Sequence, residues 1–319
     1  MACYDVFNGD ADGLCGLQQL RLAHPLDTTL VTGVKRDIAL LKRVAAVAGD
    51  EVTVLDVSLD KNRQPLEALL AAGVAVRYFD HHFAGEIPQH SNLQAHIDTA
   101  PSTCTSLIVD AYLNGQQRAW AVVGAFGDNF DDSATTAAKP LALSGAQLGE
   151  LRELGIYLNY NGYGATIDDL FFPPDELARR MRPFADPLQF IAEDPEVFAT
   201  LRSGSREDTA HAQAIAPELL SDRYALYIFP AEPWARRVSG VYSNQLATAA
   251  PDRAHALLTH LPDGGFVVSL RAPLNNKTGA DELCRAFPTG GGRKAAAGIN
   301  NLPDELLSEF IDKFKAMYG

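Results

Sequence analysis

Carboxylates and a histidine pair recur along the first half of the chain in a pattern that could bind metal ions. Asp10 and Asp12 lie in the run NGDADG, and Asp56 ends the run EVTVLD. If folding brings such carboxylates together, they repel one another and burial raises their pKa values. Two divalent cations about 3.5–4 Å apart remove that penalty and can clamp a displacement at phosphorus. The candidate ligands are Asp10, Asp12, Asp56, His81 and Asp128.

Each of these motifs also has a structural interpretation. Asp-x-Asp-Gly by itself is commonly a turn, and a histidine pair is commonly a surface or core feature. The metal interpretation is favoured because the acids and the histidine follow successive predicted strands in order. Carboxylates with one imidazole suit Mn²⁺ or Mg²⁺, and no thiolate-rich zinc motif is present.

The elements that must position these residues alternate between strand and helix. Short apolar runs rich in β-branched residues are separated by amphipathic stretches, which predicts a mainly parallel α/β sheet with helices on both faces. In such a sheet the carboxyl ends of the strands form the binding edge. Strands are expected at 3–7, 28–33, 51–57 and 74–80, and helices at 13–23, 38–48, 61–72, 102–113 and 120–126.

The second half of the chain has a different pattern. Helical stretches broken by prolines extend to about residue 220, and strands are then expected at 224–229, 255–261 and 265–271, followed by a C-terminal helix at 304–318. We therefore divide the chain into a metal-binding domain (1–145), a helical extension and linker (146–222) and a smaller α/β domain (223–319). Within the linker, LNYNGYG (158–164) is interpreted as a turn rather than as a base-stacking platform.

A second candidate site lies in the smaller domain. The run GGGRKAAAG (290–298) combines three glycines with Arg293, and successive backbone N–H groups there could cradle an anion. Arg271 ends a predicted strand and could contact a phosphate with two hydrogen bonds. The alternative is a flexible turn before a segment of small residues, and the motif alone does not decide between the two.

Composition restricts the partners. The 319 residues carry a net charge of −13, and 47% are apolar and 21% charged. Proteins that grip long nucleic acids usually present a basic face, so a small phosphorylated substrate fits this charge better. No stretch looks able to span a bilayer, the N-terminus lacks a signal-peptide pattern, and the four cysteines show no paired spacing. We expect a cytoplasmic protein with reduced thiols.

The ordered set DADG (10–13), Asp56, DHH (80–82), Asp128 and a late GGG-x-x-AAAG resembles the DHH phosphoesterases. It looks most like the branch that joins a DHH domain to a DHH-associated C-terminal domain. This branch includes RecJ-like exonucleases and oligoribonucleases that also hydrolyse phosphoadenosine phosphate. The resemblance covers nearly the whole chain apart from the helical stretch 145–220.

The resemblance implies a role for each motif residue. Asp10 and Asp12 would each hold one of two Mn²⁺ ions, Asp56 would bridge them, and His81 and Asp128 would complete one shell. His82 would face the phosphate and protonate the leaving oxygen, with Asp80 orienting the histidines. The residues implied to hold the rest of the substrate are Arg271, Gly290, Gly291, Gly292 and Arg293.

Two positions depart from the family pattern. Many members place a histidine or an aspartate just ahead of DxD as a further metal ligand, whereas this chain has Val6 and Asn8 in that region. The late motif usually reads GGGH, and here Arg293 replaces the histidine. Arginine keeps a donor and a charge but cannot transfer a proton at neutral pH.

We therefore expect a two-metal phosphoesterase, with Mn²⁺ or Mg²⁺, that hydrolyses short oligonucleotides, dinucleotides or phosphoadenosine phosphate. We expect no membrane partner and leave open a homodimer. Two alternatives remain at this point. One is a related hydrolase of pyrophosphate, polyphosphate or a cyclic dinucleotide. The other is a degenerate DHH protein that binds a nucleotide without turnover.

Overall fold

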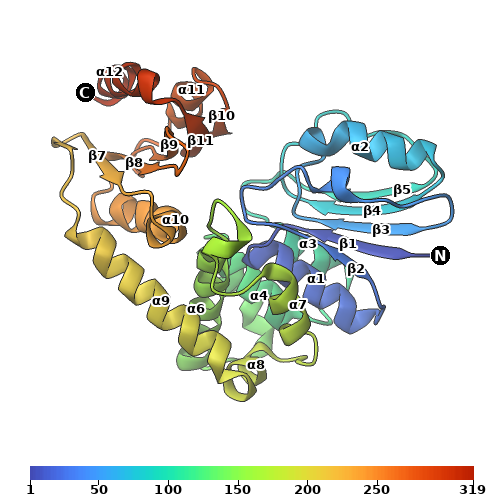
Figure 1. Ribbon diagram of the computed structural model, residues 1–319. Coiled ribbons are helices and arrows are strands. Elements are labelled where there is room, and N and C mark those ends of the chain that lie inside the picture. The colour runs from blue at the N-terminus through green and yellow to red at the C-terminus, as the bar shows by residue number, and fades with distance from the viewer. The chain divides into compact units, whose positions relative to one another are not determined.

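The computed structural model describes residues 1–319, and the chain divides into two compact units. The first unit is Met1–Arg202 and the second is Ser203–Gly319. Each has a β-sheet with helices packed on both faces and an apolar core on each side of the sheet (Figure 1).

The first unit is built on five parallel strands in the order β2-β1-β3-β4-β5. Their bounds are β1 (Cys3–Phe7), β2 (Thr29–Val31), β3 (Glu51–Leu55), β4 (Ala75–Asp80) and β5 (Leu93–Ile97). The predicted α/β class with a mainly parallel sheet is confirmed. The fifth strand was not predicted, because LQAHI mixes polar and apolar residues and lies half-exposed at the edge of the sheet.

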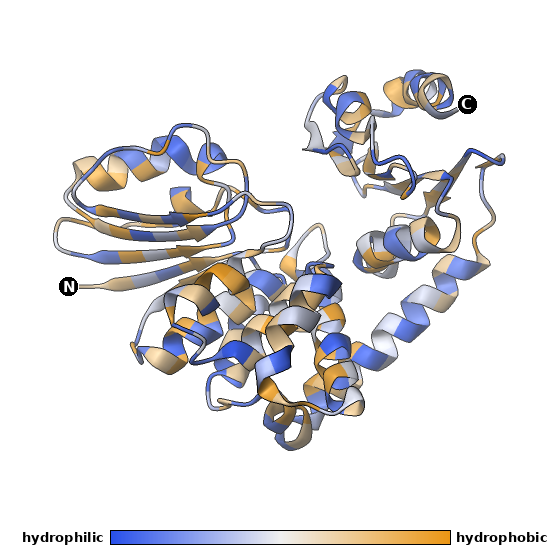
Figure 2. Ribbon diagram, turned by 180° about the vertical axis from the view of Figure 1, so that it is seen from behind, coloured by the Kyte–Doolittle hydropathy of each residue, from blue (hydrophilic) through white to orange (hydrophobic).

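Helices cover both faces of this sheet, as predicted. On one face lie α2 (Leu59–Ala71) and the short η1 (Leu40–Arg43), which share a core with the strands. On the other face lie α1 (Ala11–Ala23), α3 (Thr105–Tyr112) and α4 (Arg118–Gly127). Figure 2 shows hydrophobic segments on these helices, and Trp120 of α4 is fully buried in their core.

The helix expected at 38–48 is wrong, since only the 3₁₀ turn η1 forms there. Asn62 of α2 supplies the physical reason. Its side-chain oxygen accepts the Leu41 N–H at 3.2 Å, and its amide donates to the Ile38 carbonyl at 2.6 Å. These backbone groups are therefore satisfied by a neighbouring helix rather than by helical turns of their own.

The segment predicted as a separate linker packs largely within the first unit. It contains α6 (Gly145–Asn161), α7 (Pro174–Met181), α8 (Pro187–Glu193) and α9 (Pro195–Ala214), preceded by α5 (Asp131–Ala138). A Cβ on Gly155 would lie 2.3 Å from the Val123 carbonyl oxygen, so α6 crosses α4 at very close range. This contact joins the two helices in one core. The division after residues 145 and 222 therefore differs from the observed boundary, which lies after Arg202.

The second unit contains a six-stranded mixed sheet in the order β10-β11-β9-β8-β7-β6. The bounds are β6 (Leu219–Leu220), β7 (Tyr224–Phe229), β8 (Ala254–His260), β9 (Phe266–Arg271), β10 (Gly290–Arg293) and β11 (Ala296–Leu302). One face packs on α10 (Pro233–Ala249), and the other packs on α11 (Ala280–Arg285) and α12 (Leu307–Tyr318). The smaller α/β domain expected from the sequence is thus present.

None of the helices combines the length with the apolar composition that crossing a bilayer requires.

Candidate metal centre

The ends of three parallel strands bring the predicted acidic residues together in the first unit. Asp10 follows β1 and Asp56 follows β3, while His81 follows β4. Their side chains are buried, as is that of Asp12 in the first turn of α1. Asp128 joins them from the C-terminal end of α4. The five predicted ligands therefore come from one edge of the sheet and from one helix end.

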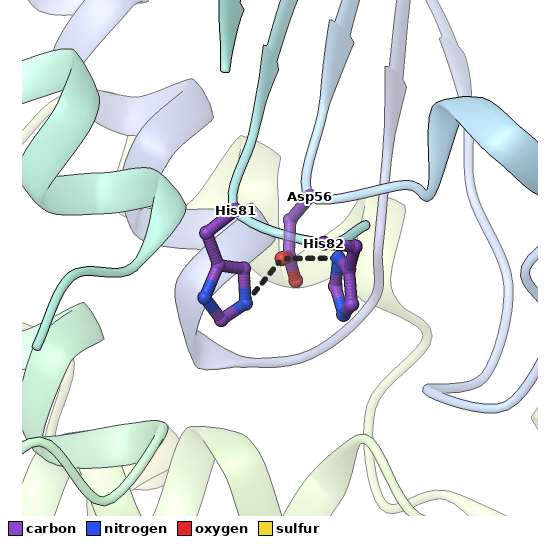
Figure 3. A group of neighbouring side chains, drawn as sticks. All are labelled: Asp56, His81 and His82. Carbon is purple, nitrogen blue, oxygen red and sulfur yellow. Dashed lines mark ion pairs between the residues drawn. The ribbon is translucent and has the colours of Figure 1, made fainter. Parts of the chain in front are cut away.

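His81 lies at the middle of three carboxylates. Its Nε2 atom is 3.5 Å from Asp56 Oδ1, 3.6 Å from Asp128 Oδ2 and 4.0 Å from Asp12 Oδ2. Figure 3 shows the ring beside Asp56. The other ring nitrogen, Nδ1, lies 3.1 Å from the Thr103 carbonyl oxygen, which can only accept a hydrogen bond. Nδ1 therefore carries the proton in the neutral ring, and Nε2 turns a lone pair toward the carboxylates.

The N-terminus of α3 fixes two of these carboxylates. Asp12 accepts hydrogen bonds from the Thr105 N–H at 2.7 Å and the Ser106 N–H at 2.8 Å. Cys104 at the N-cap makes no side-chain capping bond, so the Asp12 carboxylate satisfies these orphan donors instead. The Thr105 hydroxyl also donates to Asp56 Oδ1 at 3.1 Å.

Asp56 has a strained backbone that turns its side chain into this cluster. Its φ of 57° lies in the left-handed region, which is uncommon for residues other than glycine, although aspartate adopts it more readily than most. The Asp56 N–H donates to the Phe79 carbonyl at 3.0 Å, which holds the chain where β3 ends beside β4. Backbone strain that persists at a cluster of charged groups is typical of functional sites.

Burial sets the electrostatics of the cluster. It raises the pKa of Asp56 well above the ordinary value, and the charges of Asp10, Asp12 and Asp128 raise it further. Burial likewise raises the pKa of Asp12, with His81 opposing the shift and Asp128 and Asp10 adding to it. A cation between these groups would reverse both effects, because it favours the ionised carboxylates. Three carboxylates within 4.0 Å of an imidazole lone pair are a donor set that fits a divalent ion.

His82 has a different environment from His81. Its Nδ1 atom lies 2.7 Å from Asp80 Oδ1 and 3.8 Å from Asp56 Oδ1, and its side chain is 39% exposed. Asp80 also accepts the His81 N–H at 2.9 Å, so one fully buried carboxylate contacts both members of the pair. The second oxygen of Asp80 is buried with no hydrogen-bond partner. Asp80 thus orients a half-exposed imidazole at the mouth of the cluster.

Sequence reasoning missed Lys35, which contacts the same cluster. Its Nζ atom forms an ion pair with Asp10 and lies 3.3 Å from Asp128 Oδ1 and 2.8 Å from Asn159 Oδ1. Burial raises the pKa of Asp10, but Lys35 outweighs it and holds that pKa below its ordinary value. Lys35 follows β2. A search for cations as well as acids after the predicted strands would therefore have found it.

The segment 158–164 was interpreted as a turn, and this is wrong for its first half. Helix α6 continues through Asn161, which places the buried Asn159 against Lys35. Tyr160 is fully buried in the structure, so its ring offers no platform for a base. The ring centroid of Tyr163 lies 5.6 Å from Lys35 Nζ, a cation–π contact.

The second predicted site lies in the second unit. Arg271 and Arg293 both pair with Ala296, from opposite sides of β11, so they face the same side of the sheet. Arg271 Nε donates to Asn244 Oδ1 at 2.7 Å, while Arg293 is exposed on the edge strand β10.

The glycine-rich segment forms an edge strand, β10, rather than the flexible turn that was one of the two alternatives. A Cβ on Gly290 would lie 1.7 Å from the Cys284 carbonyl oxygen, and one on Gly292 would lie 2.4 Å from Ala297 Cα. Glycine at these two positions lets β10 approach both α11 and β11. At Gly291, by contrast, a Cβ would meet nothing within 4 Å.

Comparison with solved structures identifies the fold. The manganese-bound exonuclease RecJ has a TM-score of 0.62 at 17% identity, over 99% of this chain and 89% of RecJ. The DHH domain of a member of a ribosomal-protein family has a TM-score of 0.67 at 12% identity, over 99% and 86% of the two chains. A pGpG-specific phosphodiesterase, PggH from Vibrio cholerae, has a TM-score of 0.55 at 12% identity, over 99% and 98%.

No protein-family model and no curated protein sequence matches the chain. The likeness of the three structures is therefore one of fold, and it spans both units. The chain has the fold of RecJ and of the DHH-domain proteins, which confirms at the level of fold the resemblance seen in the DADG and DHH motifs.

Proposed function

We propose that the chain is a metal-dependent phosphoesterase that hydrolyses short, nucleotide-like substrates. The observation that carries this proposal is the His81 centre. Three carboxylates lie within 4.0 Å of His81 Nε2, and the Thr103 carbonyl fixes the tautomer that points a lone pair at them. A divalent cation bound there would polarise a phosphoryl oxygen and make a nearby water more acidic. Mn²⁺ or Mg²⁺ suits this oxygen-rich set.

His82 is the proposed general acid. Asp80 Oδ1 lies 2.7 Å from Nδ1 and orients the ring, so that a protonated His82 could deliver a proton from Nε2 to the leaving oxygen. The ring is partly exposed beside Asp56, where a phosphate could reach it. Asp80 acts through His82 and is a positioning residue.

The second unit is proposed to bind the part of the substrate that does not react. Arg271 and Arg293, on one face of the sheet, would contact a distal phosphate, and the outer edge of Gly290–Arg293 would lie beside it. The net charge of −13 favours a short substrate over a long nucleic acid. The similarity to a pGpG-specific phosphodiesterase makes a linear dinucleotide the first substrate to test.

A substrate panel tests this function. It would contain pGpG, a short oligoribonucleotide, phosphoadenosine phosphate, pyrophosphate, polyphosphate, a cyclic dinucleotide and a chromogenic phosphodiester, each with Mn²⁺ or with a chelator. We expect hydrolysis of the dinucleotide and the oligoribonucleotide only with metal. Asp12→Asn should abolish it, because Asp12 faces His81, whereas Asp132→Asn at an exposed position of α5 should not.

Other outcomes of the panel separate the alternatives. Turnover of pyrophosphate or polyphosphate without turnover of nucleotides would replace the proposed substrate class. Nucleotide affinity without hydrolysis of any substrate would indicate a degenerate protein that binds a nucleotide without turnover. Mn²⁺-independent hydrolysis would contradict the metal centre.

A further inference from the structure

The Lys35 ammonium has a complete set of partners. A lysine ammonium carries three N–H donors, and Nζ contacts three side-chain oxygens, those of Asp10, Asp128 and Asn159. The backbone is held as well, since the Lys35 N–H donates to the Gly162 carbonyl at 2.7 Å. Only 21% of the side chain is exposed. Lys35 is therefore built into the cluster and does not reach over it from the surface.

The oxygens of Asp10 are all engaged without a metal. Oδ1 caps α1 by accepting the N–H groups of Asp12 at 3.0 Å and Gly13 at 3.1 Å. Oδ2 accepts from Lys35. Asp10 is absent from both groups of side chains whose ligand atoms lie close enough together to hold an ion, one formed by Asp12, His81 and Asp128 and the other by Asp56, His81 and His82.

Asp128 connects the ammonium to the His81 centre. Its Oδ1 lies 3.3 Å from Lys35 Nζ, and its Oδ2 lies 3.6 Å from His81 Nε2. One oxygen of Asp128 thus faces the ammonium and the other faces the position that a cation beside His81 would occupy, which resembles the way a carboxylate bridges two metals. Here one of the two positions is already filled by the ammonium.

Asn8 holds this arrangement in place. Its side-chain amide donates to the Lys35 carbonyl at 3.2 Å, and its Oδ1 accepts the Asp10 N–H at 3.2 Å. The position where the resemblance expects a metal ligand therefore fastens Lys35 to the residue that it neutralises. Asn8 thus stands where a metal ligand is expected, and the same residue holds Lys35 beside Asp10.

We propose that the centre binds one divalent cation, through Asp12, Asp56, His81 and Asp128, and that Lys35 replaces the second cation of a two-metal site. The proposal rests on the proposed function and departs from the two metal ions that the sequence resemblance implies. The ammonium neutralises Asp10 and positions Asp128 before any metal arrives, so the centre needs only one ion for saturation.

The test counts Mn²⁺ in the full chain and in a matched pair of variants. Titration calorimetry and metal analysis would compare the unaltered protein with Lys35→Ala, which exposes Asp10, and with Lys61→Ala on the surface of α2. We expect one ion per chain in the unaltered protein and in Lys61→Ala, and two in Lys35→Ala. Lys35→Arg, which keeps the charge, should bind one.

Electron paramagnetic resonance gives a second measurement that needs no variant. One bound Mn²⁺ gives a six-line spectrum, while two ions about 3.5–4 Å apart give an exchange-coupled spectrum. A coupled pair in the unaltered protein would overturn the proposal, as would a single ion in folded Lys35→Ala. If Lys35→Ala does not fold, the spectrum of the unaltered protein decides.

The same data separate this inference from the proposed function. One bound ion without hydrolysis of any substrate would remove the phosphoesterase activity and leave the role of Lys35 intact. Two bound ions together with hydrolysis would contradict the role proposed for Lys35 and leave the phosphoesterase activity intact. No bound ion would contradict both.

Discussion

The two candidate regions differ in how firmly their charged side chains are held. One is the His81 centre of the first unit, and the other is the arginine row of the second unit, Arg271 and Arg293. At the centre, carboxylates are fixed by backbone amides of α3 and by the Lys35 ammonium. Along the row, Arg271 is tethered to Asn244, and Arg293 lies exposed on an edge strand. The carboxylates of the His81 centre are therefore held in place, whereas Arg293 of the arginine row is exposed to solvent.

This difference indicates a division of labour. A preorganised, buried centre can lower the barrier for any phosphoester that reaches it, because its charges need no rearrangement. The tethered Arg271 and the exposed Arg293 can distinguish substrates by the phosphates they carry but cannot supply the chemistry. Variants of the centre should therefore affect all substrates alike, and variants of the row should affect only substrates with a distal phosphate.

The largest effect is expected from the histidine pair. His82→Ala should lower kcat by roughly 10²–10⁴-fold for every substrate while leaving Mn²⁺ affinity nearly unchanged, because Asp80 rather than the metal cluster orients this ring. His81→Ala should instead weaken Mn²⁺ binding, since Nε2 faces three carboxylates. Calorimetric titration and steady-state kinetics of both variants measure the two effects.

A matched control keeps this test specific. His90→Ala changes an exposed histidine outside the cluster and should leave both quantities unchanged. An equal loss of Mn²⁺ affinity in the His81 and His82 variants would show that both rings are ligands, in line with the spacing of Asp56, His81 and His82.

A smaller and substrate-dependent effect is expected from the arginine row. Arg271→Ala should lower kcat/KM for pGpG by roughly 10–150-fold, the equivalent of about 1.5–3 kcal/mol for a hydrogen bond to a charged group. It should barely change hydrolysis of a chromogenic phosphoester, which has no distal phosphate. Arg293→His, which introduces the residue usual in the DHH phosphoesterases that the sequence resembles, should stay active if only a donor is needed there.

Thermal melting is the control for the arginine variants, because Arg271 also bonds to Asn244. A normally folded Arg271→Ala protein that slows both substrates equally would refute the distal role. It would also end the division of labour between the two regions.

Much of the first unit could be predicted because its strands are short apolar runs separated by amphipathic helices. The errors fall where a tertiary contact overrides local pattern. The Asn62 side chain bonds to the Leu41 N–H and the Ile38 carbonyl, which replaces helical hydrogen bonds at η1. Strand β5 is too polar to be distinguished from a loop. The close α4–α6 crossing at Gly155 joins the expected linker to the first unit, and no local signal in the sequence reveals which helices will cross.

The candidate site could be predicted in its acids and histidines, because several acids and an imidazole at successive strand ends would repel or remain unpaired without a cation. Lys35 was missed because a single lysine after a strand is ordinary in sequence. Its meaning depends on Asn159, which is far away in the sequence and contacts Nζ at 2.8 Å. The helical state of Asn159 was hidden by the neighbouring Asn and Gly residues, which favour a turn.

The smallest effect separates packing from recognition within the glycine segment. Gly290→Ala should destabilise the protein by about 1–3 kcal/mol, because the new Cβ would overlap the Cys284 carbonyl oxygen. Gly291→Ala has room, so its melting should be unchanged, or raised slightly as the unfolded chain loses freedom. If the outer edge of β10 lies beside a phosphate, the Gly291 methyl group should still lower pGpG turnover, by less than about tenfold or 1.4 kcal/mol. Calorimetric melting and kcat/KM of the two variants measure this, and unchanged pGpG turnover in Gly291→Ala would leave packing as the only role of the motif.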